Sequence, residues 1–296
     1  MGFWKRQYKI NFPEIGYEFA NTLRVKFSIE KDLTKQTNKS NVEIYNLSDN
    51  TRKALEKPDI NCEFFAGYEG DGGVTKMFVG NVIQAYSEVN GLDIITKFNL
   101  SDGQVAIRDS IMSISFPPNI LGNTIINAIA RNMGLPVVFG EGATFGTFTN
   151  GYSFIGKGAD ALSEICYGSG CKWSIQNNIL QIILDNGITT TRGIVFSASS
   201  GLIGNPERVI KSNYKSDKDS KTRQKKIKNN TDRAEKQAGW KIKTLLSPSI
   251  NPGDAIKLES KEITGWFKVE KIKHHGDTHA SEWTSDIDLI ERLIYT

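Results

Sequence analysis

Near its C-terminus the chain reads Gly239-Trp240-Lys241-Ile242-Lys243-Thr244-Leu245-Leu246-Ser247-Pro248. Similar short runs follow it, namely Ile250-Asn251-Pro252-Gly253-Asp254, Gly265-Trp266-Phe267, His274-His275-Gly276-Asp277-Thr278 and Trp283-Thr284. Aromatic and β-branched residues favour strands, whereas Pro-Gly and Gly-Asp pairs favour tight turns. These residues therefore predict a string of short antiparallel strands, as in a β-barrel or a β-sandwich.

The N-terminal third alternates apolar and polar residues in the same manner. We predict strands, with a break at Pro13 and a hairpin turn at 69–73, over residues 8–29, 41–48, 62–68, 76–86 and 92–100. Ser48 is expected to cap a short helix that ends before Pro58, because a serine hydroxyl satisfies a free N–H group and proline disfavours a helical predecessor. This third is also predicted to be an antiparallel barrel or sandwich.

The middle of the chain changes its period. Apolar residues recur at helical spacing over 121–133 and again over 159–167, and glycines close both segments. Strands over 171–175 and 179–184 are expected to pair across Asn177-Asn178. This pattern predicts a small α+β domain, after which strands resume from about residue 193.

Three domains are therefore expected. They are a first β-barrel over 1–103, an α+β middle domain over 104–190, and a second β-barrel over 191–296 with a basic loop insertion at about 211–238. A faint repeat supports two related barrels, because Ile60-Asn61-Cys62, Met77-Phe78-Val79 and Leu92-Asp93-Ile94 are spaced much like Ile250-Asn251-Pro252, Trp266-Phe267-Lys268 and Trp283-Thr284-Ser285. Chance similarity between two unrelated antiparallel barrels is the alternative explanation.

Composition excludes several protein classes. The chain has 296 residues, a net charge of +4 and three cysteines, an odd number that argues against a disulfide scaffold and fits a reducing compartment. The N-terminal residues lack the apolar core of a signal peptide, and no apolar run approaches the roughly 18–20 residues of a membrane span. We expect a protein with no membrane anchor that is made inside a cell.

Several segments, taken in order along the chain, resemble the central baseplate hub proteins of tailed bacteriophages, with contractile phages as the expected group. Besides the C-terminal runs quoted above, they are Val42-Glu43-Ile44-Tyr45-Asn46-Leu47-Ser48-Asp49-Asn50-Thr51-Arg52, Ala66-Gly67-Tyr68-Glu69-Gly70, Phe78-Val79-Gly80-Asn81-Val82, Gly156-Lys157-Gly158-Ala159-Asp160-Ala161-Leu162, Cys171-Lys172-Trp173-Ser174-Ile175-Gln176 and Ser200-Gly201-Leu202-Ile203-Gly204-Asn205-Pro206. Each motif is weak alone, but the ordered set is fairly specific and covers nearly the whole chain.

The resemblance implies a fold and a role. In that family each subunit has two tail-tube-like barrels and forms a homotrimer, so that six barrels join the sixfold tail tube to the threefold central spike. It implies a non-enzymatic structural hub without cofactors, located in the virion tail baseplate and assembled in the host cytoplasm. The implied partners are the tail tube or a distal tube-adaptor protein, the central spike protein, the tape measure protein and other baseplate proteins, with DNA only in transit.

Candidate catalytic and metal sites are weak. His274, His275 and His279 are close in sequence, but Gly276-Asp277 predicts a turn rather than the helix that would bring two imidazoles together. Gly168-Ser169-Gly170 is not a nucleophile elbow, Gly156-Lys157-Gly158 lacks the spacing of a phosphate loop, and Cys166 and Cys171 are expected in the core. We predict no catalytic, cofactor or metal site.

The basic segment is the remaining candidate. Between residues 211 and 243 there are twelve Lys and Arg residues against four acidic ones, with almost no apolar residues before 236. It is interpreted as a solvated loop, as an arm that docks on an acidic neighbouring tail protein, or as a DNA-binding segment. The candidate partner-contact residues are Lys215, Lys218, Lys221, Arg223, Lys225, Lys226 and Lys228.

Other functions stay open at this point. The main alternative is a tail-associated protein that binds the cell wall or hydrolyses peptidoglycan. The aromatic residues of 139–154 could line a sugar site, although phenylalanine predominates there and a packed loop at a subunit contact is preferred. A homologous hub from a contractile injection machine other than a phage is a third possibility.

Overall fold

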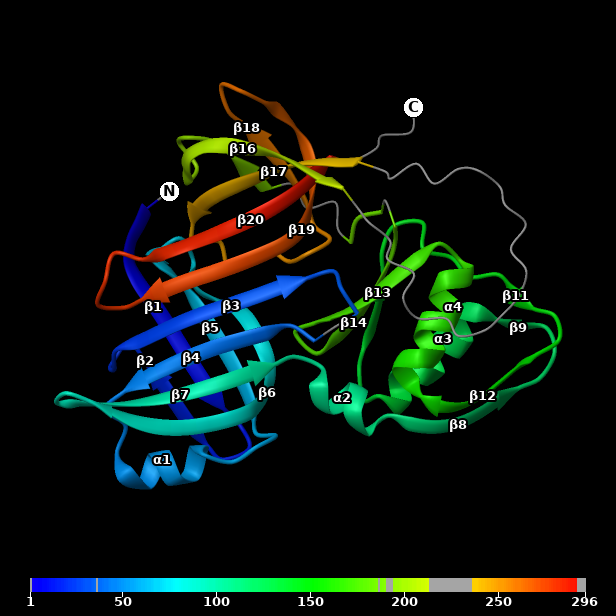
Figure 1. The fold of residues 1–296 in the computed structure, drawn as a ribbon, viewed down its shortest axis with the longest axis horizontal. Helices are drawn as coiled ribbons and strands as arrows, with labels where there is room; N and C mark the ends of the chain where they lie inside the picture. Colours follow the sequence, from blue (N-terminus) through cyan, green and yellow to red (C-terminus); the bar gives the residue numbers. More distant parts are fainter. Residues whose placement is uncertain (1, 36, 186, 190–193, 213–235, 292–296) are drawn as a thin grey trace.

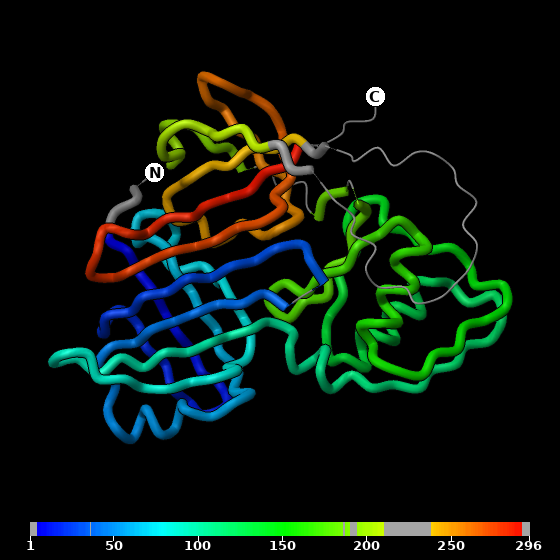
Figure 2. Tube along the Cα trace, in the orientation of Figure 1, coloured from blue at the N-terminus to red at the C-terminus, as the bar shows by residue number. Residues whose placement is uncertain are grey.

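The computed structural model describes residues 2–35, 37–185, 187–189, 194–212 and 236–291. Long strands from the two ends of the chain lie side by side, and a smaller α+β unit from the middle of the chain projects from them (Figures 1 and 2). The predicted fold class, mainly β with an α+β insert, is confirmed. Among the described residues, no helix is long and apolar enough to cross a membrane.

The N-terminal strands form what we call the N-terminal β-module. Its strands pair in the order β3-β4-β7-β6-β5-β1-β2. Helix α1 (Asp49–Leu55) is capped as predicted, because the Ser48 hydroxyl accepts a hydrogen bond from the Thr51 N–H. The strands are β1 (Gly2–Phe12), β2 (Tyr17–Ala20), β3 (Val25–Asp32), β4 (Lys39–Tyr45), β5 (Asn61–Gly70), β6 (Gly73–Asn90) and β7 (Asp93–Ser101).

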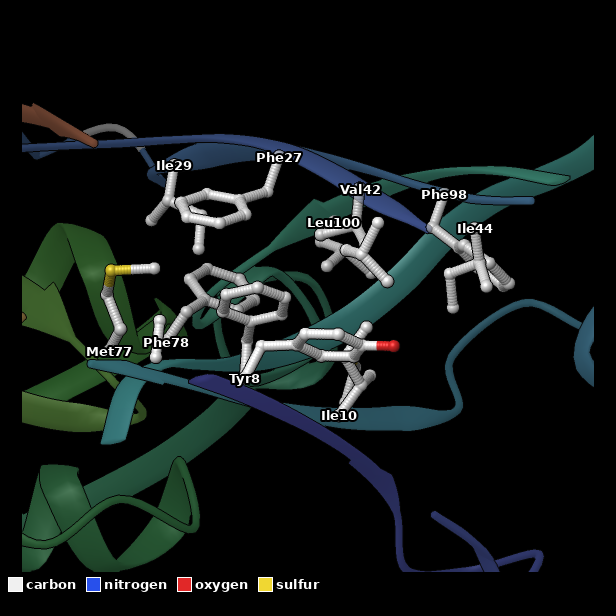
Figure 3. Packing of buried hydrophobic residues seen from close by; sticks show 14 of the residues in the cluster. Tyr8, Ile10, Phe27, Ile29, Val42, Ile44, Met77, Phe78, Phe98 and Leu100 are labelled. Atoms are coloured by element: carbon white, nitrogen blue, oxygen red, sulfur yellow. The ribbon is translucent and has the colours of Figure 1, made fainter. Parts of the chain in front are cut away.

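Apolar side chains on one face of these strands fill a single core. Side chains of β3, β4 and β7 point toward those of β1 and β6, so that the curved sheet closes around its apolar interior (Figure 3). Strands β3 and β4 show the period of two that a sheet with one buried face requires, whereas residues 77–80 of β6 are buried in succession. The largest fully buried residues include Phe12, Phe64, Phe78 and Phe98.

The C-terminal strands form the C-terminal β-module. They pair in the order β16-β17-β20-β19-β18-β15, in which only the β15–β18 pair is parallel. A separate apolar cluster lies within it, centred on residues such as Ile256, Leu258 and Val269. The strands are β15 (Ile194–Phe196), β16 (Leu202–Ser212), β17 (Lys236–Leu245), β18 (Ala255–Glu259), β19 (Thr264–Asp277) and β20 (Trp283–Glu291).

The two modules share one strand connectivity. Five consecutive strands of each module are arranged in the same order across the sheet. The order is β3-β4-β7-β6-β5 in the N-terminal module and β16-β17-β20-β19-β18 in the C-terminal module. The register of the predicted repeat was wrong, however. Matching strand pairings make Ile60 equivalent to Asp254, Val79 to Trp266 and Ile94 to Trp283, so the motifs proposed from sequence were displaced by two to four residues.

The middle unit has its own apolar core. Helices α3 (Gly122–Asn132) and α4 (Gly158–Gly168) pack together and on the hairpin of β13 (Cys171–Gln176) and β14 (Ile179–Leu184), as the sequence predicted. Asn177 and Asn178 both have positive φ, which fits a tight hairpin turn. Elements that were not predicted are α2 (Gln104–Asp109), β8 (Ile111–Phe116), β9 (Ile120–Leu121), β10 (Val137–Phe139), β11 (Thr147–Phe148) and β12 (Tyr152–Lys157).

The aromatic residues of 139–154 serve this core. Phe145 and Tyr152 are buried, and the rings of Phe139 and Phe145 meet edge to face at 6.2 Å between centroids. Phe148 and Phe154 pack against the same cluster. These rings therefore contribute to packing within the α+β unit.

Candidate assembly interface between the two β-modules

The two β-modules are joined edge to edge. Strand β3 of the N-terminal module pairs antiparallel with β19 of the C-terminal module, from the Lys26–Asp277 pair to the Asp32–Lys271 pair. The result is one continuous 13-stranded sheet, in which β3 and β19 lie next to each other (Figure 1). This pairing was not predicted from the sequence.

Aromatic packing continues across the joint. Trp283, on β20 of the C-terminal module, is 1% exposed and belongs to the apolar cluster of the N-terminal module. Its ring meets that of Phe27 edge to face at 5.1 Å between centroids, and Phe27 in turn packs on Phe64 at 4.8 Å. Gly276 lies between them, since a Cβ atom there would sit 2.4 Å from the Phe27 ring and 2.7 Å from the Trp283 ring.

The prediction of a turn at Gly276-Asp277 was wrong. Both residues belong to β19, and the chain turns over the following residues before β20 begins. Glycine is required at 276 by the close approach of two rings rather than by a turn. Asp277 ends the strand and accepts a hydrogen bond from the His279 N–H at 2.9 Å, which starts the turn.

An ion pair links the modules at the same place. The Arg24 guanidinium donates to both carboxylate oxygens of Asp277, at 3.2 Å from Nε and 2.8 Å from the second nitrogen. Arg24 also lies over the Tyr45 ring, and next to it Val25 and Thr278 exchange hydrogen bonds at 3.0 Å. Hydrogen bonding to Arg24 lowers the pKa of Asp277. A bidentate pair fixes geometry as well as adding energy.

We expect a double-mutant cycle with Arg24→Ala and Asp277→Ala to give a coupling free energy of about 1–2 kcal/mol near pH 7. Because the folded-state pKa of Asp277 is lowered, this stabilisation is present above the ordinary carboxylate pKa. It is lost as the pH falls through the lowered value. Denaturant unfolding of the four proteins at pH 7 and near pH 3 would measure it, and a coupling energy that did not change with pH would contradict the ion-pair assignment.

The three histidines have different partners. His274 is fully buried and its Nδ1 is 2.8 Å from the Ser285 Oγ, and burial lowers its pKa well below the ordinary value. The His275 Nε2 lies 3.6 Å from an Asp286 carboxylate oxygen, while the His279 ring contacts Thr278. Within the described residues, no group of three or more His, Cys, Asp or Glu side chains is placed to hold a metal ion.

A buried polar cluster connects the middle unit to both modules. Lys31, on β3, is fully buried and donates to the side-chain oxygens of Asn177 at 2.9 Å and Asn251 at 3.0 Å. These two acceptors come from the β13–β14 turn and from the loop before β18. Beside them, Asp102 accepts from the Asn38 side chain at 2.9 Å and from the Asn177 N–H at 3.1 Å. We call Lys31, Asn38, Asp102, Asn177 and Asn251 the junction cluster.

Burial perturbs both charges of the junction cluster. Desolvation lowers the pKa of Lys31 to about 8, although Asp102 and Asp254 favour its charged form. Desolvation likewise raises the pKa of Asp102 to about 6, against the hydrogen bonds from Asn38 and the charge of Lys31. A buried charge costs free energy unless hydrogen bonds and opposite charges compensate it, so Lys31 and Asp102 depend on the hydrogen bonds of this cluster.

The pH dependence of Lys31 is testable by Lys31→Met, which keeps the length of the side chain and removes its charge. Since the folded-state pKa is lowered, the contribution of Lys31 to stability is full above about pH 10.5 and is lost as the pH falls through about 8. The unfolding free energy of the wild type should therefore rise, relative to Lys31→Met, by about 2–3 kcal/mol between pH 8 and 10.5. Parallel pH profiles of the two proteins would contradict this prediction.

The remaining sequence candidates lie elsewhere. Lys215, Lys218, Lys221, Arg223, Lys225, Lys226 and Lys228 fall outside the described residues. Cys62, Cys166 and Cys171 are buried and free, and burial raises the pKa of each thiol. Ser169 lies between helix α4 and strand β13, so it is not on a strand-to-helix elbow. Gly156-Lys157-Gly158 leads directly from β12 into α4, without the intervening loop of a phosphate site. The joint of β3 and β19, by contrast, was missed because sequence alternation does not identify the neighbour of a strand edge.

Solved structures share this fold, although no protein-family model and no curated protein matches the sequence. The 43 kDa tail protein of prophage MuSo2 from Shewanella oneidensis superposes with a TM-score of 0.64 at 11% identity, and 97% of each chain is covered. A tail protein from Neisseria meningitidis MC58 gives 0.63 at 10% identity, again over 97% of each chain.

A third similar structure comes from a secretion system. The Escherichia coli protein c3393, described as a component of the type VI secretion system with structural similarity to the T4 bacteriophage tail proteins gp27 and gp5, gives a TM-score of 0.58 at 9% identity. The match covers 90% of this chain and 73% of that protein. The chain thus has the fold of phage tail proteins over nearly its whole length.

Proposed function

We propose that this protein is a structural hub of a phage tail baseplate, in which three copies present six equivalent β-modules around the tail axis. The observation that carries this proposal is the duplication of one strand connectivity within a single chain. A heterologous contact that repeats by rotation closes into a ring. With two modules per chain, a ring of three copies offers six similar module faces to a sixfold partner. Because it contains three identical chains, the same ring also has the symmetry of a threefold partner.

The partners follow from this arrangement. Six similar faces suit a sixfold tail tube or a distal tube-adaptor protein, and threefold symmetry suits a trimeric central spike. The tape measure protein and, during ejection, DNA would pass along the axis, and other baseplate proteins would bind the periphery. The virion tail is the proposed location, after assembly in the host cytoplasm. Similarity in fold to phage tail proteins supports the location in a tail.

We propose a structural role without catalysis. The junction cluster lies between three parts of the chain and connects them through hydrogen bonds, which is a structural role. The basic segment at about 211–238 is proposed as an arm that docks on an acidic neighbour. A cell-wall-binding or peptidoglycan-hydrolysing tail protein is the alternative, and a zymogram of the purified chain would reveal hydrolysis as a cleared band.

The hub role is tested by deleting the gene from the phage or prophage that carries it. We expect particles whose tails lack the spike, with infectivity restored by the wild-type gene supplied in trans. A matched complementation with a chain lacking residues 213–235 tests the docking arm separately. Tails that carry complete baseplates in the absence of the protein would contradict the proposed function.

A further inference from the structure

The joint inside one chain provides a template for a contact between copies. Counted along the chain among the five strands that the modules share, it uses the first of one module, β3, and the fourth of the other, β19. In the same count, β16 is the first shared strand of the C-terminal module and β6 is the fourth shared strand of the N-terminal module. The corresponding contact, β6 with β16, is not made within the described part of this chain.

The equivalence of β6 and β19 holds at the level of single residues. Each strand has a bulge at the same place, between Val82 and Gln84 in β6 and between Val269 and Lys271 in β19. At that place, the Val82 carbonyl accepts from the Asp59 N–H at 2.7 Å, and the Val269 carbonyl accepts from the Gly253 N–H at 2.8 Å.

The two donors of these bonds also share a backbone conformation. Asp59 has a φ of 64° and Gly253 a φ of 95°, so both lie in the left-handed region. Such a residue is uncommon outside glycine, and its recurrence at one position of both modules supports a common backbone. Beyond the bulge, β19 continues alongside β3. The structure pairs the matching part of β6, residues 84–90, with β7 alone.

Two strand edges are therefore without a strand partner in the described residues. One is the edge of β6 that faces away from β7 over residues 84–90, beyond the part of β6 that pairs with β5, and the other is the edge of β16 that faces away from β17. They lie at opposite ends of the continuous layer β6-β7-β4-β3-β19-β20-β17-β16, as Figure 1 shows. Unpaired edges of this length are templates for pairing with another chain. Their placement at opposite ends suits a head-to-tail ring.

We propose that β16 of one copy pairs antiparallel with residues 84–90 of β6 in the next copy, which repeats between chains the joint that β3 and β19 make within one. This inference rests on the ring of three proposed above and specifies the surfaces that close it. The partner is a second copy of this chain rather than a different tail protein, because both surfaces of the joint are already present in one chain.

The template fixes the register of the new pair. Lys273 corresponds to Tyr86, and Glu30, which follows the Ile29–Ser40 pair, corresponds to Val209. Lys273 lies opposite Glu30 in the joint, so Tyr86 should lie opposite Val209. Tyr86 is 41% exposed in the single chain. An aromatic residue facing a β-branched one is a favourable cross-strand pair.

The same register sets Glu88 opposite Glu207. Like charges directly opposite each other destabilise a strand pair, but Lys97 makes an ion pair with Glu88 on the neighbouring strand. This ion pair lessens the repulsion between the two glutamates, and the Tyr86–Val209 pair is the contact that favours the register.

Disulfide trapping tests the register directly. Opposed cross-strand residues lie about 5 Å apart, which is within the range that a disulfide spans. The full chain carrying Tyr86→Cys and Val209→Cys, treated with oxidised glutathione, should give covalent dimers and trimers on non-reducing gels. The matched control carries Tyr86→Cys and Lys261→Cys, where Lys261 is exposed in the turn before β19 and far from β16 in sequence. The native cysteines are buried in both proteins.

Crosslinking of the 86–209 pair at least tenfold faster than the control pair would support the proposal. A chain that is trimeric by native mass spectrometry, yet crosslinks no faster at 86–209 than in the control, would overturn this interface and leave the hub role standing. A double variant that stays monomeric and uncrosslinked, both purified and in isolated tails, would overturn it as well. Loss of the spike in the gene deletion reports on the hub role independently of either result.

Discussion

Trp283→Ala should lower the unfolding free energy by about 3–5 kcal/mol, the usual cost of removing a buried tryptophan. The side chain is 1% exposed and, although it belongs to the C-terminal β-module, it completes the apolar core of the N-terminal one. Its loss should leave a cavity beside Phe27 and Phe64, which the joined sheet prevents from collapsing. Denaturant unfolding monitored by circular dichroism would measure the change.

Trp266→Ala is the matched control for this prediction. Trp266 lies on β19 where that strand pairs with β18, outside the joint, and is 43% exposed, so its removal should cost about 1 kcal/mol or less. Tryptophan fluorescence would also differ, because loss of Trp283 should reduce the blue-shifted part of the spectrum, to which the buried Trp173 still contributes, whereas loss of Trp266 should not. Equal destabilisation by the two substitutions would show that Trp283 does not bridge the modules.

Gly276→Ala should destabilise the protein by about 1–3 kcal/mol, the range for overpacking a well-packed core. The new methyl group would lie 2.4 Å from the Phe27 ring and 2.7 Å from the Trp283 ring, distances that real Cβ atoms do not tolerate. One of the two rings must move to remove this clash, and both rings lie beside the pairing of β3 with β19. We therefore expect the destabilisation to loosen the joint, with faster hydrogen exchange along β3.

Gly265→Ala, in the same strand, provides the comparison. Its Cβ atom would be 3.4 Å from the nearest ring atom, an ordinary contact, so the change should be neutral or stabilising by up to about 1 kcal/mol. Adding Phe27→Leu to Gly276→Ala should recover part of the lost free energy, because the smaller side chain makes room. Additive effects of these two substitutions would contradict the proposed clash.

Local features of the fold were predictable because neighbouring residues determine them. The Ser48 cap, the Asn177-Asn178 turn and the apolar faces of α3 and α4 each depend on a few consecutive side chains. Strand alternation likewise predicted which side chains enter a core. These signals were sufficient for the fold class.

The joint was not predictable by the same reasoning. Alternation assigns a strand two faces but says nothing about which strand lies at its edge, and β3 and β19 are more than 230 residues apart. Gly276 was misinterpreted as a turn residue because the two rings that require a glycine there are distant in sequence. Strand β12 escaped detection because Ile155 is apolar yet exposed, which breaks the alternation in sequence, whereas β8 alternates regularly and was missed.

The repeat was visible in sequence but its register was not. Bulges and loops of different length separate the two modules, so a fixed offset between motifs cannot align all five strands. The hydrogen bonds at Val82 and Val269 establish the correct alignment. The duplication therefore became convincing only through backbone pairing.

An electron cryomicroscopy reconstruction of the tail tip, made without imposing sixfold symmetry, tests the central claim most directly. We predict a ring of three chains whose six β-modules stand at equal angular intervals around the axis, with the β3–β19 joint alternating with an intermolecular one. A ring with another number of copies, or one in which the two modules of a chain lie at different radii from the axis, would contradict the account.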